Sequence, residues 1–281
     1  MASPHDFSVY KERRDSFIGA ISKMHDKMNK VLEEKDKKTS EMSDGIIVLS
    51  ADFEGDGAFV QESSFYYFTG LKEPGAVCVL GLDGSQQLYI PNCIEEREKW
   101  VNYETPLRQK NAQKLGFDTI TELGEKCFRY QIYPFSPQKE YAALIERIKA
   151  CVQSEAKVFV TLPKVSYGYL HQRLLLARLM HWTTDLEKSV VDCSDAIAMM
   201  RQNKSNHEIE TIFKAIQITA EAQAAAAQAI ADGVNEAEVQ ATLEYIMTAN
   251  NARKAFPSIV GSGPNSTVLH YGDNNRTMKK G

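Results

Sequence analysis

The sequence FPSIVGSGPNSTVLHY, from Phe256 to Tyr271, holds two short β-rich runs around a turn. FPSIVGSG and TVLHY have the composition of strands, and the glycines and proline between them are typical turn residues. Two helical stretches precede this segment. Long helices followed by strands are typical of the beginning of an α+β domain. Because two strands cannot cover two helices, we expect the sheet in this region to be incomplete.

Both preceding helices carry start signals. Ser205 and Glu208 form the pattern S-x-x-E, a capping box whose side chains satisfy free backbone amides at a helix start. Apolar residues then recur at helical spacing, and the alanine-rich stretch that follows has high helix propensity. We expect this helix to end at Asp232–Gly233, with the glycine as a left-handed cap. The pattern N-x-x-E over Asn235–Glu238 predicts a second helix, which runs to about Thr248.

The N-terminal part of the chain alternates between strand and helix patterns. GIIVLSA from Gly45 and KVFVTL over Lys157–Leu162 predict strands, and a helix is expected over Tyr167–Leu179. AVCVLGL and QQLYI lie on either side of Asp83–Gly84 and predict a β-hairpin. This alternation indicates an α/β domain that extends to about Cys193.

The first residues form a charged lead-in. A helical pattern covers Asp6–Met42, and its later part, Lys27–Glu41, alternates basic and acidic residues with few apolar ones. Such a stretch is typical of a solvated helix face or a connector. We therefore expect an N-terminal domain over residues 1–193, with residues 1–44 as its helical lead-in, and the beginning of a second domain over residues 194–281.

Composition narrows the function classes. The 281 residues carry a formal net charge of −4, which argues against nucleic acid as a partner because phosphate binding needs concentrated Lys and Arg. The N-terminus lacks the apolar core of a secretory signal, and no apolar run is long enough to cross a membrane. The five cysteines include no C-x-x-C pair, so we expect reduced thiols in a cytoplasmic protein.

Three segments together resemble a known family. The first is FVQESSFYYFTGLKEPGAVCVL, over Phe59–Leu80, followed by YIPNCIEEREKW up to Trp100. The second is MMRQNKSNHEIETIFKAIQITAEA, over Met199–Ala222, and the third is FPSIVGSGPNSTVLHYGDNNR, over Phe256–Arg276. They resemble Xaa-Pro aminopeptidase, also called aminopeptidase P, of the creatinase, prolidase and methionine aminopeptidase group. The first segment favours aminopeptidase P over methionine aminopeptidase, which lacks such a domain.

The resemblance implies a fold and a cofactor. The expected architecture is an α/β creatinase-like N-terminal domain followed by the first part of an α+β pita-bread domain. That domain binds two divalent metals, usually manganese, through two Asp, one His and two Glu. The first of these ligands would follow His270 shortly and lie beyond Gly281, so we expect no metal ligands in this chain. The resemblance thus implies a C-terminally truncated family member that binds no metal by itself.

Two residues are candidate site residues by resemblance. His270 matches a family histidine that assists hydrolysis through a hydrogen bond or a proton transfer, whereas its residue type alone also fits a structural histidine at a strand end. Trp100 matches a tryptophan that reaches a neighbouring subunit's site and packs on the substrate proline, which implies a homo-oligomer. A half-buried helix tryptophan is the alternative. Ser262, between two glycines, fits a tight turn and has no partner that would make it a nucleophile.

The resemblance implies an enzyme that releases the N-terminal residue preceding proline, with peptides that carry proline at the second position as substrates. A prolidase- or creatinase-type hydrolase is one alternative. A non-catalytic pita-bread module that binds peptides or proteins is another, because some such domains have lost their metal ligands. The intact His270–Tyr271 pair argues against this last alternative.

Overall fold

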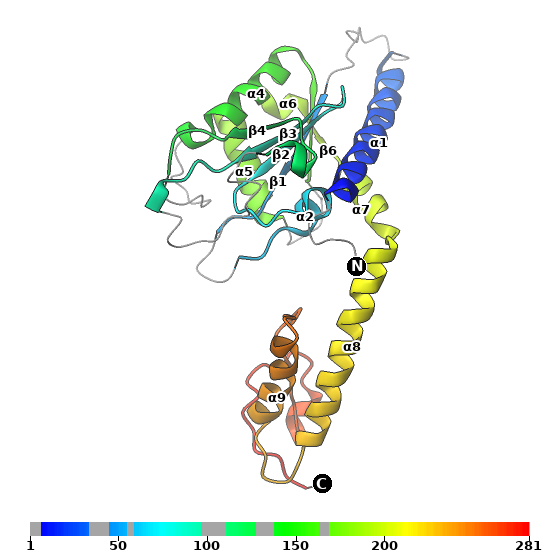
Figure 1. The fold of residues 1–281 in the computed structure, drawn as a ribbon, viewed down its shortest axis with the longest axis vertical. Coiled ribbons are helices and arrows are strands. Elements are labelled where there is room, and N and C mark those ends of the chain that lie inside the picture. Colours follow the sequence, from blue (N-terminus) through cyan, green and yellow to red (C-terminus); the bar gives the residue numbers. More distant parts are fainter. Residues whose placement is uncertain are drawn as a thin grey trace. The chain divides into compact units, whose positions relative to one another are not determined.

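The computed structural model describes residues 7–33, 45–54, 59–96, 111–127, 138–162 and 169–280. The chain divides into two compact units, Met1–Gln202 and Asn203–Gly281 (Figure 1). The domain boundary that we expect between residues 193 and 194 stays a prediction. Among the described helices, none is both long enough and apolar enough to cross a membrane.

The first unit is built on a mixed sheet. The described strands follow the order β4-β3-β2-β1-β5-β6. Their bounds are β1 Gly45–Ser50, β2 Val77–Gly81, β3 Gln86–Ile90, β4 Thr119–Glu122, β5 Lys157–Val160 and β6 Val190–Asp192. β2 pairs with β1 and with β3 in antiparallel fashion, and the remaining pairs are parallel. The predicted hairpin and the strands expected at Gly45 and Lys157 are confirmed.

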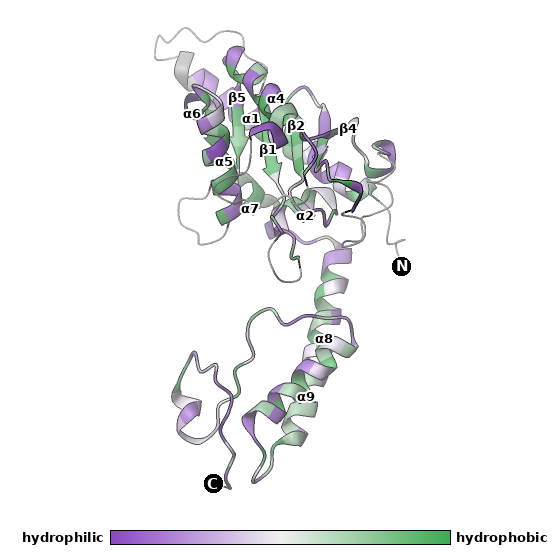
Figure 2. Cartoon of the chain, turned by 90° about the vertical axis from the view of Figure 1, so that its left-hand side faces the viewer, coloured by the Kyte–Doolittle hydropathy of each residue, from purple (hydrophilic) through white to green (hydrophobic). Residues whose placement is uncertain are grey.

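Helices cover both faces of this sheet (Figure 1). Along β1, Ile47 and Leu49 enter one core cluster, and Ile46 and Val48 enter another. Such a strand is buried on both faces, which explains its unbroken apolar sequence. Figure 2 shows β1, β2 and β5 mostly in the green of hydrophobic residues. The helices are α1 Ser8–Glu33, α2 Ser63–Thr69, α4 Ala142–Gln153, α5 Leu170–Trp182, α6 Leu186–Ser189 and α7 Ser194–Gln202, with short 3-10 helices η2 Gln113–Leu115 and η3 Gln138–Tyr141.

A buried arginine joins α1 to the sheet. Arg14 has no exposed surface, and its guanidinium donates to Gln86 Oε1 at 2.7 Å, to Phe68 O at 2.8 Å and to Gly116 O at 2.5 Å. Its guanidinium also lies 3.9 Å from the ring centroid of Phe117. Burial lowers the pKa of Arg14, and the hydrogen bonds compensate the desolvation of the charge. The expected helix over Asp6–Met42 is thus observed as α1, and residues 34–44 lie outside the described part.

The second unit begins with two packed helices, α8 (Asn206–Ala229) and α9 (Glu236–Ala249). Both predicted capping boxes are confirmed, at Ser205 and at Asn235. Small residues of α8 allow close contact, and Ala226 packs with Val239 of α9 and with Met278. The helix α8 ends at Ala229, before the end that the sequence predicts at Asp232–Gly233. The chain becomes extended at Ile230, and Gly233 adopts a left-handed φ of 86° in the turn, where its N–H donates to Met278 O.

The strands expected within Phe256–Tyr271 are wrong. No strand is present there, and residues Gly263–Thr267 form a 3-10 helix, η4. A strand needs a neighbour for its backbone groups, but the Val260 N–H donates to the Asn274 side chain at 2.9 Å. In the described part of this unit, the sole β-bridge joins Asn235 to Thr277. A segment with the composition of a strand but no neighbouring strand to pair with is therefore irregular here and is held by side-chain hydrogen bonds.

Candidate functional site

His270 lies in an exposed turn after η4. The turn is closed by a bond from the Tyr271 N–H to Val268 O at 3.3 Å. The residue is exposed, and no described residue makes a hydrogen bond to the His270 imidazole. Trp100, the other predicted site residue, lies outside the described residues. The structure therefore describes only one of the two candidates.

A buried carboxylate lies beneath the His270 segment. Glu236, the first residue of α9, has no exposed surface. Its Oε1 accepts from the Ser262 N–H at 2.6 Å and from the Ser262 hydroxyl at 2.7 Å. Its Oε2 accepts from the Tyr271 hydroxyl at 2.6 Å and from the Arg276 N–H at 2.9 Å. These four donors all come from the loop that carries His270.

The ionised form of Glu236 is stabilised strongly. Burial by itself raises the pKa of this carboxyl, but hydrogen bonds from Tyr271, Ser262 and the Arg276 N–H outweigh it and lower the pKa to about 2. Glu236 also lies in the first turn of α9, where the helix dipole favours a negative charge. The carboxylate is therefore charged throughout the physiological pH range.

The same face of α9 holds two further polar side chains. Gln240 accepts a bond from the Asn274 amide at 2.8 Å, and Asn274 also donates to Ser258 O at 2.8 Å. Glu244 accepts from Lys254 Nζ at 2.9 Å and from the Ser258 hydroxyl at 2.7 Å. Hydrogen bonds from Lys254, Ser258 and Gln240, in that order, lower the pKa of Glu244 to about 2. One helix face thus anchors the loop from Lys254 to Arg276.

The glycines of GSG are required by the loop's own packing. Gly263 has a left-handed φ of 51°, and a Cβ there would lie 2.6 Å from the Arg276 guanidinium. A Cβ on Gly261 would lie 2.9 Å from Asn265 O. The Asn265 backbone cannot move aside as the Arg276 side chain can, so Gly261 is required by this contact and Gly263 by its positive φ, which supports the tight-turn interpretation of this segment.

The described residues offer no cluster of metal ligands. In the described part of the chain, no three His, Cys, Asp or Glu side chains converge where they could hold an ion. These described residues do not fit a two-metal centre. That the ligands lie beyond Gly281 stays a prediction.

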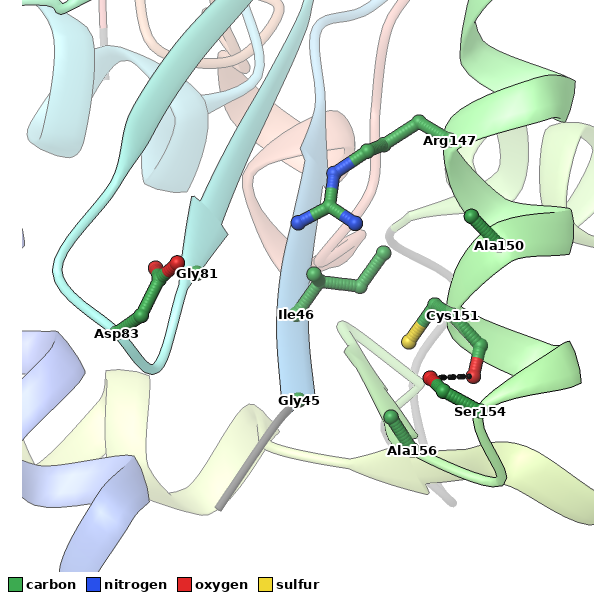
Figure 3. Close-up of a pocket in the computed structure, with 9 residues that line it drawn as sticks. All are labelled: Gly45, Ile46, Gly81, Asp83, Arg147, Ala150, Cys151, Ser154 and Ala156. Carbon is green, nitrogen blue, oxygen red and sulfur yellow. Dashed lines mark hydrogen bonds between the residues drawn. The ribbon is translucent and has the colours of Figure 1, made fainter. Parts of the chain in front are cut away.

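A pocket of about 230 Å³ lies in the first unit (Figure 3). Arg147 extends from α4 across β1 toward Ile46 and Asp83 in this view. Asp83 is already engaged as a turn residue, because Ser85 donates to it through its hydroxyl at 2.7 Å and its N–H at 2.9 Å. The Ser85 bonds lower the pKa of Asp83. The other groups of the lining that could act as nucleophiles, the Cys151 thiol and the Ser154 hydroxyl, donate to the backbone oxygens of Lys157 and Cys151, so neither of these bonds pairs a nucleophile with a base.

The anchoring residues were missed from the sequence. Glu236, Gln240 and Glu244 recur every four residues on a predicted helix, which places them on one face. Such a polar stripe is typical of a solvated face, and nothing in the pattern shows that Glu236 is buried. The pattern that could have indicated the anchored loop is a row of hydrogen-bond acceptors on one helix face, followed by a loop rich in Ser, Asn and Gly.

Comparison with known proteins agrees with this architecture. Residues 10–127 match the family model of the aminopeptidase P N-terminal domain, and residues 210–281 match that of metallopeptidase family M24. The Xaa-Pro aminopeptidase of Escherichia coli is 27% identical over 79% of this chain and 48% of its own length. The Xaa-Pro dipeptidase of Pyrococcus horikoshii is 25% identical over 92% of this chain and 58% of its own length.

Solved structures show the same fold. Aminopeptidase PepP of Pseudomonas aeruginosa has a TM-score of 0.71 at 21% identity, over 98% of this chain and 56% of its own. Aminopeptidase P of E. coli has a TM-score of 0.67 at 20% identity, over 100% of this chain and 57% of its own. The expected fold class, an α/β N-terminal domain followed by the beginning of a pita-bread domain, is confirmed.

The two family models match one after the other, an aminopeptidase P N-terminal domain followed by metallopeptidase family M24. The relatives include Xaa-Pro aminopeptidases and an Xaa-Pro dipeptidase, and together with the two family models they support the resemblance to Xaa-Pro aminopeptidase that the three sequence segments carry. The chain spans about half the length of the curated relatives it matches.

Proposed function

We propose that this chain supplies the N-terminal domain and the His270 segment of a cytoplasmic Xaa-Pro aminopeptidase. The observation that supports the proposal is the M24 match over residues 210–281, a range that includes His270, after the aminopeptidase P N-terminal domain match over residues 10–127. The enzyme releases the N-terminal residue that precedes proline. The described residues of this chain do not hold the metals; in the whole enzyme two divalent metals, manganese in this proposal, would supply an activated water and polarise the scissile carbonyl.

His270 is the one proposed catalytic residue in the chain. Its exposed imidazole is free to meet a substrate, and imidazole can donate a hydrogen bond or transfer a proton near neutral pH. Trp100 is the proposed contact for the substrate proline, because a flat indole covers a proline ring without needing a donor. In this arrangement Trp100 acts on a neighbouring subunit, so the enzyme is a homo-oligomer.

Residues 1–281 alone are proposed to hold no metal pair and to be inactive. Calorimetric titration of this chain with manganese should show no tight binding. Tight binding of two ions per chain would contradict this part of the proposal. An assay with a peptide that carries proline second should also show no turnover by residues 1–281 alone.

The peptidase proposal is tested by extending the chain. Residues 1–280 are fused to the part of the E. coli Xaa-Pro aminopeptidase that follows its matched region, and the product is assayed with manganese. We expect release of the N-terminal residue from an Xaa-Pro-Xaa tripeptide, and a loss of about 100-fold or more in His270→Ala. A folded, metal-loaded fusion that cleaves no Xaa-Pro bond would favour the peptide-binding alternative.

The similarity to a dipeptidase motivates a second candidate. The P. horikoshii relative that matches 92% of this chain is an Xaa-Pro dipeptidase. An Xaa-Pro dipeptide and creatine, assayed beside the tripeptide, separate the alternatives. Turnover of the dipeptide alone favours prolidase, and turnover of creatine alone favours creatinase.

A further inference from the structure

We propose that Glu236 is the positioning residue for His270. Its buried carboxylate holds the loop on both sides of the histidine and so sets where the imidazole lies. The catalytic meaning of this role rests on the proposed function of His270, whereas the structural role can be measured without any activity.

The carboxylate contacts both ends of the loop. Ser262 lies before η4 and donates twice to Oε1, at 2.6 and 2.7 Å. Tyr271 directly follows His270 and donates its hydroxyl to Oε2 at 2.6 Å. Because Tyr271 is bonded to His270 through the backbone, restraining its ring restrains the adjacent residue. Charge-assisted bonds of this length are among the stronger hydrogen bonds in proteins.

A rigid helix presents the carboxylate. Glu236 begins α9, which starts with a capping box at Asn235 and packs on α8 through Val239. The backbone position of Glu236 is therefore fixed by α9 and does not depend on the loop. The loop itself has no strand pairing beyond the single bridge in the described part of the unit, so side-chain bonds set its path.

The two ends of the loop depend on Glu236 to different degrees. Arg276 is also held by the backbone, since its carbonyl accepts the Glu236 N–H at 2.9 Å, and the Asn235 amide donates to Asn275 O at 2.9 Å. The Ser262 N–H has the carboxylate as its acceptor. Loss of the carboxylate should therefore release Ser262 and Tyr271 while Arg276 stays in place.

Glu244 provides a matched control on the same helix. It is also a carboxylate that accepts three side-chain bonds, and hydrogen bonding also lowers its pKa to about 2. Its loop partners, Lys254 and Ser258, lie before the GSG turn and do not flank His270. Glu244→Gln should therefore disturb the beginning of the loop without moving His270.

The test is NMR on the full 281-residue chain labelled with ¹⁵N and ¹³C. Glu236→Gln removes the charge and leaves one acceptor oxygen, so even a retained Ser262 bond is no longer charge-assisted, and we expect the Ser262 amide to exchange with solvent at least about tenfold faster. The His270 ring resonances should shift, as assigned with a His270→Gln variant. The ring resonances of buried His25 should stay unchanged in both variants, which shows that the first unit is intact.

In Glu244→Gln, the Ser262 amide and the His270 ring should match the wild type. Unchanged Ser262 exchange and unchanged His270 resonances in Glu236→Gln would overturn the proposal. If that variant does not fold, Tyr271→Phe removes one of the four bonds and leaves the carboxylate in place. In Tyr271→Phe, the His270 ring resonances should shift in the same direction as in Glu236→Gln but by less, because only part of the anchoring is lost. Unshifted His270 ring resonances in Tyr271→Phe would also overturn the proposal. An inactive fusion enzyme with the expected NMR changes would contradict the peptidase proposal alone.

Discussion

At the residue scale, each unit depends on a buried charge. Arg14 in the first unit and Glu236 in the second have no exposed surface, and each makes several hydrogen bonds. A buried charge is tolerated only when its partners replace the lost water, and removing it leaves those partners unsatisfied. Neither residue was singled out from the sequence, because Arg and Glu on helices are usually exposed.

Arg14→Met should destabilise the first unit by about 3 kcal/mol, because Gln86 Oε1 and the carbonyls of Phe68 and Gly116 would remain buried without this donor. Lys11→Ala on the same helix should cost less than about 1 kcal/mol, since the Lys11–Asp15 pair is about half exposed. Urea unfolding of both variants measures the difference. Equal midpoints would contradict the role given to Arg14.

Acid should weaken the second unit through Glu236 and Glu244. Both have a folded-state pKa of about 2, below the roughly 4.3 expected for an unfolded Glu. Because the pKa of each carboxyl is lower in the folded state, the contribution of the two carboxylates to the free energy of unfolding is complete above about pH 4.5. It is lost as the pH falls toward 2. Thermal melts between pH 6 and pH 2.5 should show this loss. The double variant Glu236→Gln/Glu244→Gln should start less stable and depend less on pH over this range, and an identical slope would contradict the assignment.

At the element scale, local signals were predictable and long-range pairing was not. The Ser205 and Asn235 capping boxes and the β2–β3 hairpin depend on neighbours in sequence, and all three are confirmed. The strand composition of Phe256–Tyr271 could not predict its structure, because a strand exists only if another strand pairs with it. For the same reason, the sequence identified His270 through resemblance but could not show that α9 anchors its loop.

The first half of α8 exposes an apolar face. Ile209, Ile212, Phe213 and Ile216 are 41%, 48%, 62% and 56% exposed. Such a face promotes self-association, so Phe213→Lys/Ile216→Lys should lower the sedimentation-equilibrium mass without lowering the melting temperature. Ala222→Lys is the contrasting variant, because Ala222 is buried and the charge should unfold the helix pair. A wild-type chain that is already monomeric and melts cooperatively would contradict this prediction.

At the scale of the whole molecule, the two units of the chain are held together in different ways. The first unit has a described six-stranded sheet covered on both faces, and the second has two helices with a loop anchored by side chains. The resemblance predicts a domain boundary between residues 193 and 194, which stays a prediction, and the two compact units meet at Gln202–Asn203. Neither the pairing partners nor the buried network could be deduced from the motif around His270.

The most direct test is the rate at which the extended chain, loaded with manganese, releases the N-terminal residue from an Xaa-Pro-Xaa tripeptide. We predict metal-dependent release that falls by about 100-fold or more in His270→Ala, while the variant keeps its fold and its bound manganese. A folded, metal-loaded fusion that hydrolyses no Xaa-Pro bond, or one whose rate is unchanged in His270→Ala, would contradict the proposed function.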